Sequence, residues 1–125
     1  MARILIADDD MAGLAMRRLM LEGAGHQVAM AMDPSGVLRQ MEQGYDLLII
    51  DLRFLNRAGI ADCREGLNLI RKIRHAECEV PIIVLSGWAA DLDGEPELQM
   101  VQKVMLKPVP ARDLLAAIDQ LVPRK

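Results

Sequence analysis

The chain has 125 residues, of which 52% are hydrophobic and 26% charged, as expected for one packed globular domain. Its formal net charge of −3 offers no broad basic surface for a phosphate backbone, so direct binding of nucleic acid is not expected. No apolar run approaches the roughly 20 residues that cross a bilayer, and the N-terminus lacks a signal-peptide pattern. We therefore expect a single domain over residues 1–125, located in the cytoplasm and without a membrane partner.

Five short apolar runs recur along the chain, and each has the length of a strand rather than of a helix. Several of them lack polar alternation, which is typical of strands covered on both faces. The runs cover residues 4–7, 28–31, 47–50, 82–85 and 104–106. This pattern predicts a buried parallel sheet.

Helical patterns occupy the first two gaps between these runs. In the first gap, a 3.6-residue period separates an apolar side from a polar side that holds Arg17, Arg18 and Glu22. The apolar side consists of Ala12, Met16, Leu19, Met20 and Gly23, and the helix is expected to end near residues 23–25. In the second gap, Asp33 is the expected N-cap, Pro34 the first helical residue, and Gly44 lies beyond the end. Its predicted buried face consists of Val37, Leu38 and Met41.

The later gaps are less uniform. Leu67, Ile70 and Ile73 indicate a third helix. Between residues 88 and 102 a turn-rich composition weakens any continuous helix before Glu97. A last helix is predicted between Pro110 and Pro123, with its buried face at Leu114, Leu115, Ile118 and Leu121. Alternating strands and helices predict right-handed crossovers and a doubly wound α/β sheet.

In a sheet of this kind, ligands bind outside the carboxyl ends of the strands. Five polar residues stand directly after predicted strands: Asp8, Asp9, Asp51, Ser86 and Lys107. Each one alone is explained by a helix cap, a turn or a solvated surface charge. Together, like charges about 4 Å apart would repel by on the order of 4 kcal/mol per pair at an effective dielectric constant of about 20, so the cluster needs cations. Mg²⁺ and the ammonium of Lys107 would supply them, which points to phosphoryl chemistry.

Asp10 follows the acidic pair but is expected to have a different role. The chain turns into its first predicted helix at this point, where an acid can cap the helix and interact with its dipole. The three adjacent acids are therefore interpreted as a pair plus one.

Four motifs in this order resemble the receiver domain of two-component response regulators, and the resemblance covers essentially the whole chain. They are "ADD" after the first strand, "LIID" after the third, "VLS" after the fourth and "MLKP" after the fifth. The resemblance implies a flavodoxin-like fold with a five-stranded parallel sheet in the order 2-1-3-4-5 and helices on both faces.

The resemblance also implies a role for each site residue. Asp51 would be the phosphoacceptor, taking a phosphoryl group from a sensor histidine kinase or a histidine phosphotransfer protein. Asp9, Asp51 and the main-chain carbonyl of Arg53 would bind Mg²⁺ directly, and Asp8 would act mostly through metal-bound water. Lys107 and Ser86 would contact phosphoryl oxygens, and a cis peptide before Pro108 would direct the lysine into the crevice.

The sequence departs from the family pattern at three places. Val104 occupies a position that is commonly aromatic in receivers, so an aromatic switch cannot operate and the loop after Ser86 must move in another way. The segment between Asp51 and Gly66 is several residues longer than is typical, which is explained either by a tolerated insertion or by a recognition loop or lid. Arg53 and Trp88 are bulky residues at positions that tune phosphoryl loss, and we expect slow dephosphorylation.

The sequence is compatible with three functions. The first is a phosphorylatable receiver that switches an unnamed output partner or relays the phosphoryl group, with self-phosphorylation and slow autodephosphorylation as its only catalysis. The second is a receiver-like interaction module without regulated phosphorylation. The third is a small phosphatase, which is disfavoured because Arg53 occupies the position of the second acid. Formation of a homodimer through the fourth helix, fifth strand and fifth helix is left open.

Overall fold

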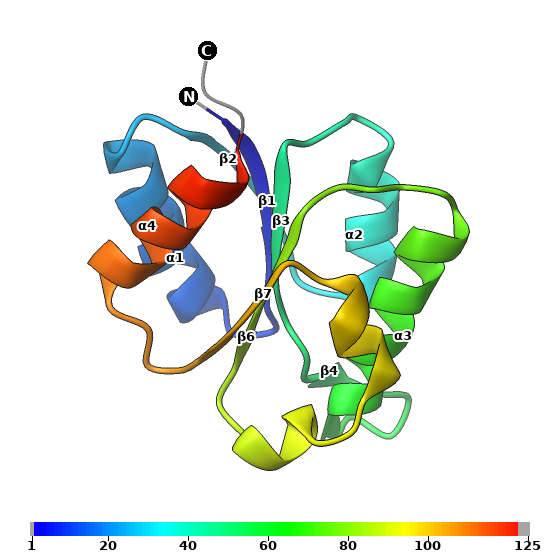
Figure 1. Ribbon diagram of the computed structural model, residues 1–125. Helices are drawn as coiled ribbons and strands as arrows, with labels where there is room; N and C mark the ends of the chain where they lie inside the picture. The colour runs from blue at the N-terminus through cyan, green and yellow to red at the C-terminus, as the bar shows by residue number, and fades with distance from the viewer. Residues whose placement is uncertain (1, 123–125) are drawn as a thin grey trace.

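The computed structural model describes residues 2–122, which form a five-stranded parallel sheet between two layers of helices (Figure 1). The strand order is β2-β1-β3-β6-β7, which confirms the predicted order because β4 and β5 form a separate hairpin. The bounds are β1 Arg3–Ala7, β2 Gln27–Ala31, β3 Leu47–Asp51, β6 Ile82–Ser86 and β7 Lys103–Leu106. Within residues 2–122 no helix combines the length and the apolar content that crossing a membrane requires.

The alternating side chains of the central strands supply two separate cores. One core packs under α1 (Met11–Gly23) and α4 (Ala111–Leu121), and the other under α2 (Pro34–Met41) and α3 (Cys63–His75) (Figure 1). Ile4 and Ile6 of β1 belong to the first core, whereas Leu5 and Ala7 belong to the second. Burial on both faces explains why these strands are uniformly apolar in sequence.

The predicted buried side of α1 is wrong. Leu14 and Leu21 are fully buried against the sheet, whereas Met16 is 70% and Leu19 67% exposed. This helix is apolar around most of its circumference, so the 3.6-residue period did not single out one face. The buried face is instead the one that contains Leu14 and Leu21, seven residues or two turns apart.

The predicted helix starts at α1 and α2 are confirmed. The Asp10 carboxylate accepts a hydrogen bond from the Ala12 N–H at 3.2 Å, and that of Asp33 from the Gly36 N–H at 2.7 Å. Pro34 opens α2, whose Val37 is fully buried, with Leu38 and Met41 partly buried against the same core.

The last predicted helix is also confirmed in its main features. Pro110 precedes the first residue of α4, and Leu114 and Ile118 are buried. Leu115 and Leu121 are only partly buried against the same core. The predicted stop at Pro123 lies outside the described residues.

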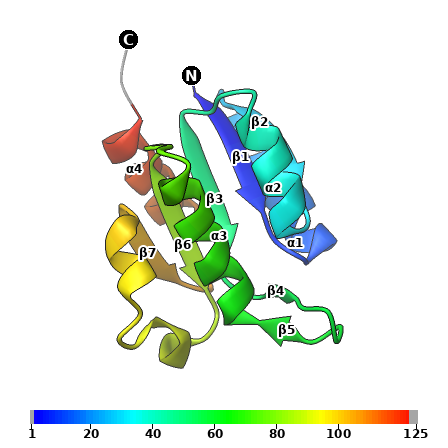
Figure 2. The same cartoon turned by 90° about the vertical axis from the view of Figure 1, so that its right-hand side faces the viewer.

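The long segment after Asp51 contains a small β-hairpin that the sequence analysis did not predict. Strands β4 (Phe54–Leu55) and β5 (Ala61–Asp62) pair antiparallel and project at the end of the sheet where β3 terminates (Figure 2). Asp62 then caps α3, which begins at Cys63. A Cβ at Gly66 would lie 2.4 Å from the Leu52 carbonyl oxygen, so only glycine lets α3 pack this closely on the backbone beside Asp51.

The prediction of a weakened helix between β6 and β7 is confirmed. Two short 3-10 turns, η1 (Ala89–Leu92) and η2 (Pro96–Met100), replace a continuous helix. Gly94 between them has φ +66°, a left-handed conformation that interrupts helical geometry, and Pro96 starts the second turn.

Candidate functional site

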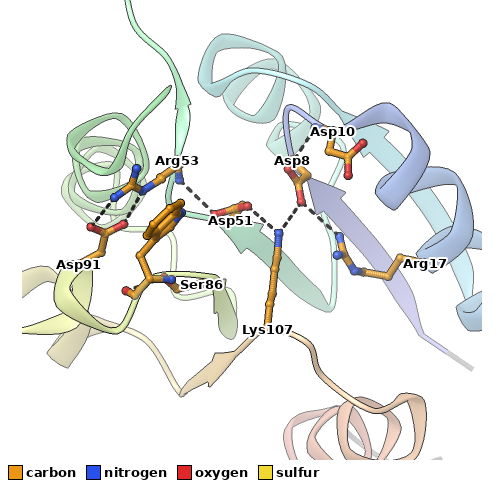
Figure 3. A network of polar contacts seen from close by, with 9 residues as sticks. Asp8, Asp10, Arg17, Asp51, Arg53, Ser86, Asp91 and Lys107 are labelled. Carbon is orange, nitrogen blue, oxygen red and sulfur yellow. Dashed lines mark hydrogen bonds and ion pairs between the residues drawn. The ribbon is translucent and has the colours of Figure 1, made fainter. Parts of the chain in front are cut away.

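The ammonium of Lys107 joins two carboxylates at the carboxyl end of the sheet (Figure 3). Its Nζ donates to Asp51 Oδ2 at 2.7 Å and to Asp8 Oδ2 at 3.0 Å. Burial alone would lower the pKa of Lys107, but these two hydrogen bonds and the two carboxylate charges raise it above its ordinary value. Residues 56 and 99 positions away from Lys107 therefore meet at one charge cluster. The peptide bond between Lys107 and Pro108 is cis, as predicted.

Arg17 is a second cation in this cluster, and the sequence analysis missed it. Its Nη1 lies 3.8 Å from Oδ2 of Asp8, whose side chain is only 2% exposed (Figure 3). The 3.6-residue period puts Arg17 on the polar side of the first helix. Its spacing of three and four residues from Leu14 and Leu21 was the available signal that it lies on the side facing the sheet.

The carboxylate of Asp9 completes an acidic group of three with Asp8 and Asp51. Burial, a hydrogen bond with Asp8, and the negative charges of Asp8 and Asp51 all raise the pKa of Asp9. The carboxylates of Asp8 and Asp51 therefore place negative charge close to Asp9. Oxygen donors in such surroundings match the preference of Mg²⁺ for hard ligands. As the side chains stand, no three His, Cys, Asp or Glu residues within 2–122 form a ready-made metal cage.

A second group of charges lies on the opposite side of Asp51. The Arg53 N–H donates to Asp51 Oδ1 at 3.1 Å, while its guanidinium donates to Asp91 at 2.8 and 3.1 Å (Figure 3). The carbon at the centre of the guanidinium also lies 4.3 Å from the ring centroid of Trp88. The hydrogen bond with Asp91, the charge of that carboxylate and the charge of Asp51 raise the pKa of Arg53. The pairing with Asp91 was not predicted, because nothing local connects residues 38 positions apart.

Ser86 is buried at the end of β6, and its hydroxyl is occupied within its own loop. Its Oγ donates to the Trp88 carbonyl and accepts from the Trp88 N–H, both at 3.1 Å. Asp8, Asp51 and Lys107 thus share direct contacts, Asp9 lies within their electrostatic reach, and Ser86 bonds to Trp88 instead. Val104, at the commonly aromatic position, is partly buried against the core.

The comparisons with known proteins agree with this arrangement. The model of the response regulator receiver domain family matches residues 4–119. The chain is 36% identical over 86 residues to the CAI-1 autoinducer sensor kinase/phosphatase CqsS of Vibrio cholerae, covering 68% of this chain and 12% of that protein. It is 28% identical to the transcriptional regulatory protein DltR of Streptococcus agalactiae, covering 93% of this chain and half of that protein.

Among solved structures, the response regulator TrrA of Thermotoga maritima in complex with Mg(2+)-BeF superposes with a TM-score of 0.83. It is 23% identical, and the superposition covers 98% of this chain and all of that one. At this identity the likeness shows the fold. The chain therefore has the fold of TrrA, while it spans half or less of the two curated relatives named above.

Proposed function

Because the chain belongs to the response regulator receiver domain family, we propose that Asp51 accepts a phosphoryl group and thereby switches a partner or passes the group onward. The observation that carries the proposal is the contact of Lys107 Nζ with both Asp51 and Asp8. The side chain of Asp51 is 12% exposed, so a donor can reach a carboxylate that is already oriented from both sides. We take residues 1–125 as one receiver domain.

The donor that fits this chemistry is a phosphohistidine on a sensor kinase or phosphotransfer protein. A carboxylate oxygen of Asp51 forms a bond to phosphorus while the bond from phosphorus to the imidazole nitrogen breaks. The imidazole keeps that electron pair and takes a proton from solvent. The transition state resembles metaphosphate, so catalysis depends on position and positive charge. Lys107 supplies that charge, and the Arg53 N–H orients the carboxylate.

Mg²⁺ is the cofactor that these donors fit. Asp9, Asp51 and the main-chain carbonyl of Arg53 would hold the ion directly, and Asp8 would hold it through water. When bound, Mg²⁺ neutralises negative charge on the transferring phosphoryl group. The support is that the carboxylates of Asp8, Asp9 and Asp51 gather at one edge of the sheet, where Lys107 contacts two of them, together with the Mg(2+)-BeF complex of the similarly folded TrrA.

A kinase partner and a cytoplasmic location complete the proposal. CqsS, whose name describes a sensor kinase/phosphatase, is similar to this chain over 86 residues. We propose a cytoplasmic receiver that is phosphorylated in trans and acts on an output partner. Val104 favours the second candidate, an interaction module without regulated phosphorylation, because a valine stands at a position that is commonly aromatic in receivers.

The test is phosphorylation by acetyl phosphate in the presence of Mg²⁺, followed by intact mass measurement. We expect one added phosphoryl group that is labile to hydroxylamine, absent in Asp51→Asn and retained in Asp93→Asn, which neutralises an exposed acid. The absence of an adduct in the wild type would contradict the proposal and favour the interaction module. Multiple-turnover release of phosphate would instead indicate a phosphatase.

A further inference from the structure

Two contacts tie the turn after β6 to the surroundings of Asp51. One is the contact of Arg53 with Asp91 and Trp88, which we name the Arg53 latch. The other is the pair of hydrogen bonds between the Ser86 hydroxyl and the backbone of Trp88. Arg53 and Ser86 stand beside the phosphoacceptor, whereas Trp88 and Asp91 belong to the turn.

Few other contacts hold this turn in place, and the main one is Leu92, which is partly buried against the core. η1 has no buried residue and no side-chain hydrogen bond at its N-cap. Trp88, the only tryptophan of the chain, is 56% exposed. A segment with few buried contacts opens at low cost in free energy, so the latch can decide its position.

On the basis of the proposed function, we propose that a phosphoryl group on Asp51 draws the Arg53 guanidinium away from Asp91 and Trp88 and so releases the turn at residues 88–92. The latch would thereby couple phosphorylation to a surface change without an aromatic residue at Val104. In this device Arg53 is a positioning residue, because it acts on the turn through Asp91 rather than on the transferred group alone.

The competition favours the phosphoryl group on grounds of charge and geometry. A phosphoryl group carries between about 1.5 and 2 negative charges at neutral pH, against one on Asp91, and it offers three acceptor oxygens. Guanidinium binds phosphate and carboxylate in the same two-pronged manner, so Arg53 can exchange one for the other. Its main-chain N–H already contacts Asp51, and its guanidinium already feels the charge of that carboxylate.

The exchange moves the turn because Asp91 cannot stay where it is without Arg53. The side chain of Asp91 is only 9% exposed, and both of its carboxylate oxygens accept hydrogen bonds from Arg53. A carboxylate that loses its partner while shielded from water is strongly disfavoured. Asp91 must therefore turn outward to solvent, which carries η1 and Trp88 with it.

Trp88 provides a direct readout, since its fluorescence reports on the stacked guanidinium. Acetyl phosphate and Mg²⁺ are added to the full chain, and the phosphorylated fraction is measured by intact mass in the same samples. We expect Trp88 emission to shift in proportion to that fraction, with faster deuterium uptake over residues 87–101. Before phosphorylation, Asp91→Asn should already show the shifted emission and the faster uptake, and it should change little when the phosphoryl group is added.

Asp93→Asn is the matched control, because Asp93 is an exposed acid of the same turn, and it should behave as the wild type. Arg53→Lys, which keeps the charge but loses the two-pronged geometry, should give an intermediate emission before phosphorylation. A phosphorylated wild type with unchanged Trp88 emission and unchanged uptake would overturn the latch but leave the proposed function intact. A wild type that acquires no phosphoryl group would overturn both.

Discussion

The two charge groups that flank Asp51 use the same kind of contact but have different mechanical support. Asp8 and Asp51 stand at the ends of β1 and β3, two neighbouring strands that are almost completely buried, and Lys107 follows the edge strand β7 of the same sheet. Arg53 and Asp91 come from a loop and from a short turn whose residues are at most partly buried. Charge pairs supported by a packed sheet hold a fixed geometry, whereas the same pairs on a weakly packed turn can exchange partners.

The largest effect should follow from removing the cation on the rigid side. We expect Lys107→Gln to slow phosphorylation of Asp51 by acetyl phosphate by about 100-fold or more, the order found when a preorganised electrostatic contact to a transition state is lost. The measurement is the time course of the mass increase with Mg²⁺ present. Lys103→Gln, at an exposed lysine of β7, the strand that Lys107 follows, should keep the wild-type rate, and equal rates for both variants would refute a special role for Lys107.

A second prediction concerns the ion pair that holds η2 against α3. Arg71 of α3 pairs with Glu97 of η2, whose side chain is 1% exposed. The hydrogen bond from Arg71 is the main cause that lowers the pKa of Glu97. Because Arg71 is itself half exposed, we expect Arg71→Ala to lower the free energy of unfolding by about 2 kcal/mol at pH 7, below the range for a fully buried pair.

The pH dependence of this loss has a defined sign. A carboxylate whose pKa is lower in the folded state stabilises the protein above its unfolded pKa of about 4.3, and this contribution is lost as the pH falls through the folded value. The difference between the wild type and Arg71→Ala should therefore shrink below about pH 4. Urea unfolding at several pH values measures it, with Lys72→Ala on the same helix as the control. A difference that stays constant with pH would argue against the ion pair as its source.

A smaller effect is expected when the cover over Asp51 on the latch side is removed. Arg53→Asn should shorten the lifetime of the phosphorylated protein several-fold, because the guanidinium drawn to the phosphoryl group would no longer keep water away from it. Trp88→Ala should shorten the lifetime less, because the released turn carries Trp88 away from the site. The decay of the mass adduct after removal of acetyl phosphate measures this lifetime. Arg57→Asn changes an exposed arginine of the same loop and should leave the lifetime unchanged. Unaltered lifetimes in both test variants would mean that these side chains do not shield the site.

The smallest effect should come from the acid that lies outside the site. Asp10 caps α1, so Asp10→Ala should cost about 1 kcal/mol of stability and leave the extent of phosphorylation unchanged. Asp9→Asn should instead weaken the dependence of phosphorylation on Mg²⁺. Parallel Mg²⁺ titrations of the two variants make the comparison. A loss of phosphorylation in Asp10→Ala would show that Asp10 belongs to the site together with Asp8 and Asp9.

Features that depend on neighbouring residues could be predicted from the sequence. The five sheet strands follow from short apolar runs, and the caps at Asp10 and Asp33 follow from acids placed directly before helices. The site at the carboxyl ends could also be located, because parallel strands place their ends at one edge. The sequence therefore determined the sheet, the helix starts and the meeting of Asp8, Asp51 and Lys107.

Only the tertiary structure decided which residues the side chains of the site contact. α1 is apolar on several sides, so docking rather than periodicity buried Leu14 and turned Arg17 toward Asp8. The contact between Arg53 and Asp91 depends on where two loops end after the sheet has formed. Periodic patterns encode the direction of a side chain within its own element, but a pairing between loops 38 positions apart is set by the packing of everything that lies between them.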